Sequence, residues 1–180
     1  MFKLFSKVAC FMFALALFVS VPPALAAQTD SVAVKVTITP AISVSIAEDA
    51  LALGSLAAGA TKVSTTAVAV TNDGSGVNET YSLSLSNPAG WTVALTPGVE
   101  TYVLSAAFSN NVAGITWDPA GHGLSTSAVA ASATKFAGDQ TGAGVPYNGV
   151  RKLWFQFKAP TATTVNTEQS VTVTITAQVS

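Results

Sequence analysis

The sequence predicts an all-β protein, built as an antiparallel sandwich or barrel, and three observations lead to this prediction. Apolar and polar side chains alternate with a period of two through most of the chain after residue 27. Clusters of Gly, Pro, Asn and Asp interrupt this alternation at short intervals and predict turns between strands. No stretch after residue 27 keeps the 3.6-residue period of an amphipathic helix, which argues against a helical domain.

Residues 1–27 have the pattern of a signal peptide and are therefore left out of the predicted fold. Two lysines come first, an apolar run from Val8 to Val21 follows, and small residues mark a cut after Ala26 or Ala27. The apolar run is shorter than the ~20 residues of a membrane-spanning helix. We therefore expect an exported mature chain, residues 28–180, that forms a single domain without a membrane span.

The composition of the mature chain excludes several functions. Six basic and nine acidic residues follow residue 27, so the net charge is −3 and no basic surface is available for nucleic acid. The one cysteine, Cys10, lies in the signal peptide, which excludes disulfides from the mature protein. The apolar run follows Cys10 instead of preceding it, which argues against a lipid anchor. These features predict a bacterial protein that is secreted, extracellular or at the cell surface, with the periplasm as an alternative.

Strands are predicted wherever apolar side chains occupy every second position. The predicted strands are Ser31–Thr39, Ile42–Ile46, Lys62–Val70, Tyr81–Ser86, Trp91–Thr96, Thr101–Ser109, Val150–Phe157 and Gln169–Val179. Pro40 ends the first of them, and runs of turn-forming residues at 72–76 and 87–90 follow the third and the fourth. In the last strand apolar residues oppose three threonines, a pattern typical of a strand with one buried face.

The first predicted strand is a candidate for self-association. Its apolar face carries Val32, Val34, Val36 and Ile38, and it begins close to the end of the signal peptide. A strand at the edge of a sheet has amide groups with which another chain can pair. Two outcomes stay open for these four residues, namely pairing within their own sandwich or pairing with another copy of the protein.

The stretch from residue 110 to residue 148 differs from the rest because it is rich in Gly, Ala, Ser and Asn and poor in large apolar residues. We predict a long loop region with one or two short strands, of which Ile115–Trp117 is a candidate, and Ser125–Ala137 has room for one or two helical turns. Loops of this length are uncommon in compact domains and often serve a function.

The stretch VRKLWFQF, residues 150–157, is the densest aromatic run of the mature chain. As a strand it directs Leu153, Phe155 and Phe157 to one face, which is predicted to enter the core. Trp154 lies on the opposite face, where it is either covered by lysine stems and the 110–148 loop or exposed as a platform for a sugar ring or a neighbouring subunit. The candidate binding residues are Trp154, Trp117, Tyr147 and Lys152, whereas Trp91 is expected in the core.

No catalytic or metal site is predicted. The single histidine, His122, has Asp118 and Ser125 nearby, but a catalytic triad depends on geometry, and the Gly-x-Ser-x-Gly elbow is missing. We expect His122 to be a solvated loop residue. One histidine is too few for a zinc site, and residues 72–76 lack the alternating acids of a calcium loop, so they are predicted to form a turn. Calcium held by backbone carbonyls would leave no mark in the sequence.

A resemblance to known modules extends over residues 50–96. The runs that carry it are GSLAAG (54–59), VAVTNDG (68–74), YSLSL (81–85) and PAGWTV (88–93). They resemble bacterial immunoglobulin-like modules of the NEW3 type and related surface modules of exported bacterial proteins. The resemblance implies an antiparallel immunoglobulin-like β-sandwich of about 7–9 strands after the signal peptide. It implies no function for any single residue, because such modules share a fold and differ in their roles.

These features together predict an exported, non-enzymatic structural or adhesive protein of the bacterial cell surface or extracellular matrix, whose partners are other copies of itself. Charged residues make up only 9% of the chain, and threonine-rich strands suit packing between copies. The alternative function is a carbohydrate-binding module whose exposed tryptophans hold a surface glycan. Neither function calls for a cofactor, a nucleic acid or a membrane span.

Overall fold

The computed structural model describes residues 31–48 and 50–180, and the predicted signal peptide lies outside these residues. The chain divides into two units, Met1–Thr37 and Ile38–Ser180. Strands dominate the second unit, which confirms the all-β prediction.

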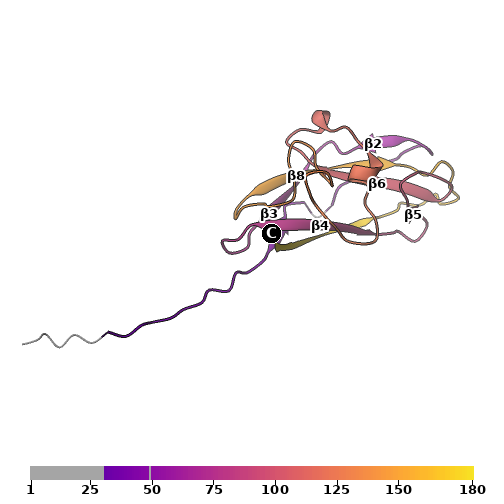
Figure 1. Ribbon diagram of the computed structural model, residues 1–180. Coiled ribbons are helices and arrows are strands. Elements are labelled where there is room, and N and C mark those ends of the chain that lie inside the picture. The colour runs from indigo at the N-terminus through magenta and orange to yellow at the C-terminus, as the bar shows by residue number, and fades with distance from the viewer. Residues whose placement is uncertain (1–30, 49) are drawn as a thin grey trace, which may run out of the picture. The chain divides into compact units, whose positions relative to one another are not determined.

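The second unit contains nine strands and two helices of a single turn (Figure 1). The strands are β1 (Val44–Ile46), β2 (Thr61–Val63), β3 (Val68–Asn72), β4 (Glu79–Ser86), β5 (Thr92–Val93), β6 (Thr101–Phe108), β7 (Val129–Ala130), β8 (Val150–Lys158) and β9 (Thr172–Val179). The helices are η1 (Val112–Gly114) and α1 (Pro119–His122).

The strands form two sheets that enclose one core. The first has the order β1-β3-β8-β6-β5, with β2 also paired to β8, and the second has the order β7-β4-β9. Among these strand pairs only β5 with β6 is parallel. Figure 1 shows β6 and β8 in one layer and β4 with the yellow C-terminal strand in the other. The arrangement fits a β-sandwich, in which two sheets bury their inner faces against each other.

The core forms where β4 faces β6 and β8. Tyr81 and Leu83 of β4 and Leu153 of β8 are fully buried, and Phe155 and Phe157 are each 8% exposed. The predicted inward face of VRKLWFQF is therefore confirmed. At about 1.5–3 kcal/mol for each fully buried large side chain, this row is a major contribution to stability.

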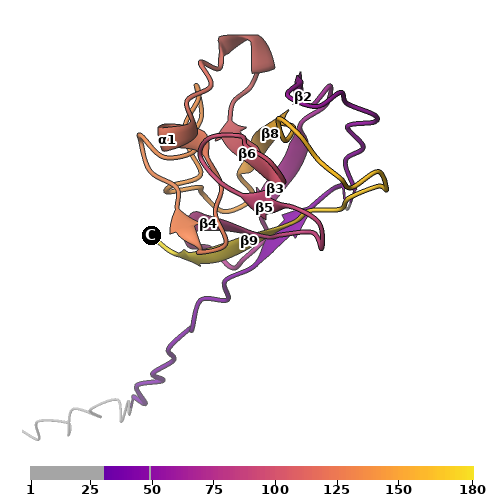
Figure 2. The ribbon, with the colours of Figure 1, turned by 90° about the vertical axis from the view of Figure 1, so that its right-hand side faces the viewer.

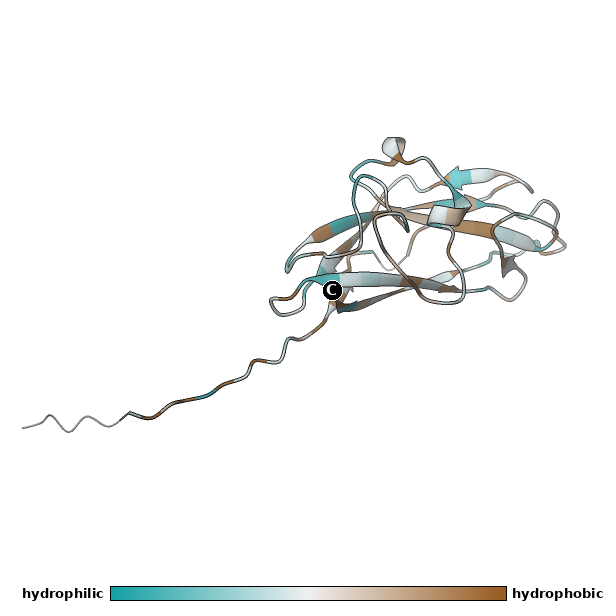
Figure 3. Ribbon diagram, in the orientation of Figure 1, coloured by the Kyte–Doolittle hydropathy of each residue, from teal (hydrophilic) through white to brown (hydrophobic). Residues whose placement is uncertain are grey.

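The predicted strand Ser31–Thr39 is wrong, because residues 31–40 form no strand. The alternation of brown and paler segments is visible in Figure 3, but Val32, Val34, Val36 and Ile38 are 80–86% exposed. Alternation predicts which side chains share a face, but it does not supply the neighbouring strand with which the amides must pair. We call residues 32–39 the N-terminal segment.

Other predicted elements change in extent. Lys62–Val70 is two strands, β2 and β3, separated by the buried Ser64, whose amide donates to the carbonyl of Phe155 at 2.8 Å. Only Thr92–Val93 of the predicted strand Trp91–Thr96 pairs in a sheet, and Leu95 is 56% exposed. Competition from loop hydrogen bonds shortens strands in ways that alternation does not reveal.

The 110–148 region contains one short strand, β7, as the sequence predicted, but the predicted positions of its elements are wrong. Ile115–Trp117 forms no strand, and the helical turn lies at Pro119–His122 instead of within Ser125–Ala137. Asp118 begins that turn because its carboxylate accepts from the amides of the second and third residues that follow it, at 3.1 Å each. Asp118 followed by Pro119, a helix-capping residue followed by proline at the first helical position, was the local signal for this helix.

The turn that follows β3 is held by a buried asparagine. Asn72 Nδ2 donates to the carbonyl oxygens of Val77 and Val145 at 2.8 and 2.9 Å, and its Oδ1 accepts from the amide of Gly74 at 3.1 Å. A Cβ on Gly74 would lie 2.6 Å from Glu79 Oε1, so this position excludes other residues. The predicted turn is confirmed. Its asparagine is needed for the buried hydrogen bonds, and its glycine is needed because no side chain fits beside Glu79.

Replacing Asn72 with alanine is predicted to lower the free energy of unfolding by about 2–4 kcal/mol, because the three hydrogen bonds of a fully buried side chain are lost at once. Chemical denaturation monitored by tryptophan fluorescence measures this change. Asn78→Ala is the matched control, since Asn78 is exposed and its side chain makes no hydrogen bond in the described chain; it should change stability by less than about 0.5 kcal/mol. Equal effects of the two substitutions would contradict the assignment.

Candidate interaction site

A groove of about 880 Å³ opens between the two sheets beside β9. Val68, Phe155 and Phe157 of the first sheet form one wall, and Val173 and Ile175 of β9 form the other. Residues of the loops at 50–56 and 165–170 also line it. Figure 2 shows β9, in yellow, at the rim of the unit beside β4. The groove is thus an opening into the side of the apolar core.

The segment that runs along the groove after β1 leaves it incompletely covered. Leu51, Leu53 and Leu56 pack against the core but stay partly exposed. Gly54 adopts a φ of +69°, so the backbone turns there and cannot continue as an extended strand. No hydrogen bond in the described chain joins residues 50–58 to β9.

The loop at the end of the groove is fastened to the start of β6 by Glu100. The hydroxyl of Thr163 donates to Glu100 Oε2 at 2.6 Å, and the amide and hydroxyl of Thr164 donate to Oε1 at 2.5 and 2.8 Å. These hydrogen bonds, that of the Thr163 hydroxyl above all, lower the pKa of Glu100 below its usual value. The same hydroxyl oxygen accepts from Trp91 Nε1 at 2.9 Å. One end of the groove is therefore preorganised.

Trp91 has a packing role close to the predicted one. It is half-buried, and its ring lies 6.0 Å from that of Phe157 and 6.3 Å from that of Tyr102. Trp91 also lines the groove. It thus connects the aromatic core to the fastened loop.

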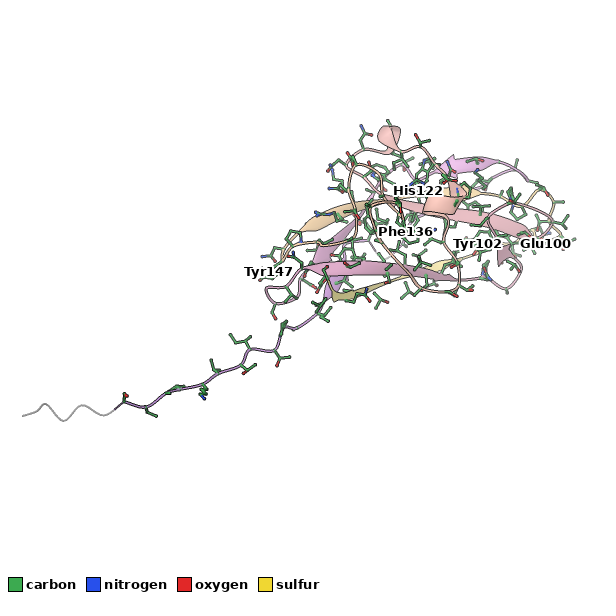
Figure 4. The ribbon with its side chains drawn as sticks, in the orientation of Figure 1. Glu100, Tyr102, His122, Phe136 and Tyr147 are labelled. Carbon is green, nitrogen blue, oxygen red and sulfur yellow. The ribbon has the colours of Figure 1, made fainter. Side chains whose placement is uncertain are left out.

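The aromatic residues among the predicted binding residues make no ring contact with one another in the described chain. Trp154 is half-buried, and its Nε1 donates to the carbonyl of Ser109 at 2.8 Å, while Lys152 on the same strand is exposed. Trp117 is half-buried, with its ring edge-on to His122 at 5.8 Å. Tyr147 is 51% exposed and lies at one end of the unit, opposite Glu100 (Figure 4).

The expectation of a solvated His122 is wrong, because the side chain is only 8% exposed. Its Nδ1 accepts from the amide of Asp118 at 3.1 Å, and its Nε2 lies 3.0 Å from the carbonyl oxygen of Ala137. A carbonyl oxygen only accepts hydrogen bonds, so Nε2 must carry the proton and donate it. The ring is therefore the Nε2-protonated tautomer that connects α1 to the rest of the 110–148 region. Ser125 directs its hydroxyl to the carbonyl of Ser127, so no Ser-His pair is formed.

The described residues contain no group of three or more His, Cys, Asp or Glu that could hold a metal ion. They also contain no helix with the length and apolar character needed to cross a membrane.

Sequence reasoning missed the groove and the fastened loop. The walls of the groove come from β3, β8 and β9, whose contact is decided only when the sheets pack. The polar run Thr161–Thr164 was a visible signal for a loop with side-chain hydrogen bonds, but nothing local pointed to Glu100 as its partner.

Comparison with protein-family models, with curated proteins and with solved structures found no match to this chain.

Thr163→Val is predicted to raise the pKa of Glu100 toward its usual value, because it removes the hydrogen bond that lowers that pKa most. Since the folded-state pKa lies below the unfolded one, the stabilisation is present at neutral pH and is lost as the pH falls through the folded-state pKa. Carboxyl NMR titration measures the pKa, and acid unfolding should become less steep in the variant. Thr161→Val, at an exposed residue whose side chain makes no hydrogen bond in the described chain, should leave the pKa of Glu100 unchanged.

Proposed function

We propose that this protein is an exported, non-enzymatic structural or adhesive subunit of the bacterial cell surface or extracellular matrix, and that it associates with copies of itself through the N-terminal segment. We also propose that its fold is immunoglobulin-like, which two largely antiparallel sheets around one core support.

The exposure of the N-terminal segment carries the proposal. Val32, Val34, Val36 and Ile38 form an apolar row that is 80–86% exposed. Monomeric soluble proteins rarely leave such a contiguous apolar row in water, and surfaces of this kind are typical of interaction sites. The segment has the composition of a strand, so pairing with another chain would satisfy its amides and bury its side chains in one step.

The low charge of the molecule supports association between copies. The mature chain carries six basic and nine acidic residues, so copies repel one another weakly. The carbohydrate-binding alternative has no comparable support, since Trp154 and Trp117 are both half-buried and no ring contact joins them in the described chain.

Light scattering of the mature protein over a concentration series tests the proposal. The wild-type protein is expected to form assemblies larger than a monomer. Val34→Asp combined with Val36→Asp should weaken association by at least roughly 100-fold, because each valine loses about 1.5 kcal/mol or more of burial and each aspartate must be desolvated.

Ala33→Asp combined with Thr37→Asp is the matched control, since it adds the same charge to the opposite face of the same segment. It should retain assembly. Wild-type protein that stays monomeric over the whole series would reject the proposal, and equal loss in the two variants would show a charge effect instead of a buried apolar face.

A further inference from the structure

The second sheet ends one strand short of closing the core. On β4 the inward residues Tyr81, Leu83 and Leu85 are 0%, 0% and 4% exposed. On β9, the neighbouring strand of the same sheet, the inward residues Val173 and Ile175 are only half-buried and line the groove. Side chains of the same kind in the same sheet therefore differ in burial, because nothing in the described chain lies beyond β9 in its sheet.

The backbone of β9 is also open on this side. The backbone groups of the odd-numbered residues of β4 point away from β9. The amides of Glu79, Tyr81 and Leu85 donate to the carbonyl groups of residues 145, 142 and 125, which lie on the other side of β4. The even-numbered residues of β4 must therefore pair with β9, where they face even-numbered residues such as Thr174.

The remaining amides of β9 point outward. They belong to the odd-numbered residues Val173, Ile175 and Ala177, and no hydrogen bond within residues 31–48 and 50–180 reaches them. Val173 and Ile175 line the groove, and Ala177 packs against the core beside it. An added strand could therefore pair with the backbone and bury this row together.

We propose that the N-terminal segment of a second copy adds to the open edge of β9 and places Val32, Val34, Val36 and Ile38 in the groove. The proposal rests on the proposed function and specifies the surface that receives the segment. A single arrangement then accounts for the exposed apolar row of the N-terminal segment and for the opening of the core beside β9.

The segment and the edge match in length and periodicity. β9 has eight residues, and so has the N-terminal segment, so that each spans roughly 27 Å when extended. Apolar residues alternate along both, with Thr or another small residue at most positions between them. A strand added to β9 would therefore face the core with every second residue, as β4 does.

Charge is compatible with this occupant, because the four residues placed in the groove are uncharged. β9 carries no charged residue, and the groove is lined by two acidic residues, Glu48 and Glu168. Lys35 is the only charged residue of the N-terminal segment and lies on the face opposite the valines. Residues 50–56 of the same chain are a poorer occupant, because Gly54 interrupts their extended backbone.

Disulfide trapping between two full-length mature chains tests the proposal. The mature chain contains no cysteine, so single cysteines can be placed freely. One preparation carries Lys35→Cys, and the other carries Thr172→Cys, Thr174→Cys or Thr176→Cys, all at exposed positions on the outer face of β9. Each pair is mixed, oxidised and measured on a non-reducing gel, and the mass of the assemblies is followed by light scattering.

The matched control pairs Lys35→Cys with Lys152→Cys, an exposed position on β8 of the other sheet. A disulfide needs Cα atoms about 4.4–6.8 Å apart. The β9 position that lies opposite residue 35 should therefore give a heterodimer yield about tenfold or more above that of the control. The other two β9 positions should give lower yields than this best position. Three separate β9 positions ensure that a single poorly folded variant cannot decide the result.

The other outcomes separate the two proposals. Assemblies that form with β9 yields equal to the Lys152→Cys control would overturn the groove as the receiving surface while leaving self-association in place. Mixtures that stay monomeric would overturn self-association itself. A chain with both Lys35→Cys and Thr174→Cys that closes its own disulfide and remains a monomer would show that the segment fills the groove of its own chain, which overturns the second copy as occupant.

Discussion

The structure depends on one strand, β8, that is paired along both of its edges and packed into the core on its inner face. β8 pairs with β2 and β3 along one edge and with β6 along the other, so its backbone is satisfied over its length. Its inner residues Leu153, Phe155 and Phe157 form the centre of the core. Its outer face is also covered in part, with Gln156 buried and Trp154 hydrogen-bonded to Ser109. A strand that is paired along both edges and buried on its inner face fixes the positions of its neighbours, because a slip in register would break the pairing and move the inner side chains out of the core.

The core that β8 organises is closed unevenly. Close to β4 it is sealed tightly enough to bury Glu79 and the hydroxyl of Tyr81, and two of their oxygen atoms have no partner within the described residues. Burial raises the pKa of Tyr81, which keeps the phenol neutral. Close to β9 the same core opens into a groove with a fastened loop at one end. The buried polar atoms of Glu79 and Tyr81 thus lie where the core is densely packed. The half-buried apolar side chains lie at the edge of β9, where a further strand can pair.

Much of the fold could be predicted from alternation alone. The strands that matter most for the core, at residues 79–86, 101–108 and 150–158, were predicted nearly to their bounds. Alternation failed where the decisive contact was remote. The N-terminal segment alternates as clearly as these strands but pairs with no strand of the described chain. His122 is buried against the carbonyl of Ala137 and the ring of Trp117. The groove could not be predicted, since its walls combine β8 and β9 with β3, which lies far from both along the chain, and Glu100 binds Thr163 across 63 positions.

The sequence by itself determined the all-β class, the inward face of VRKLWFQF, the turn at residues 72–76 and the apolar row of the N-terminal segment. These are local properties, because the chirality and pleat of a strand assign each side chain to a face without reference to the rest of the chain. Only the tertiary structure decided which strand edges are paired, which loops are fastened and where the core stays open. Pairing and burial depend on which segments meet, and a period-two pattern gives every strand the same capacity to pair without naming its partner.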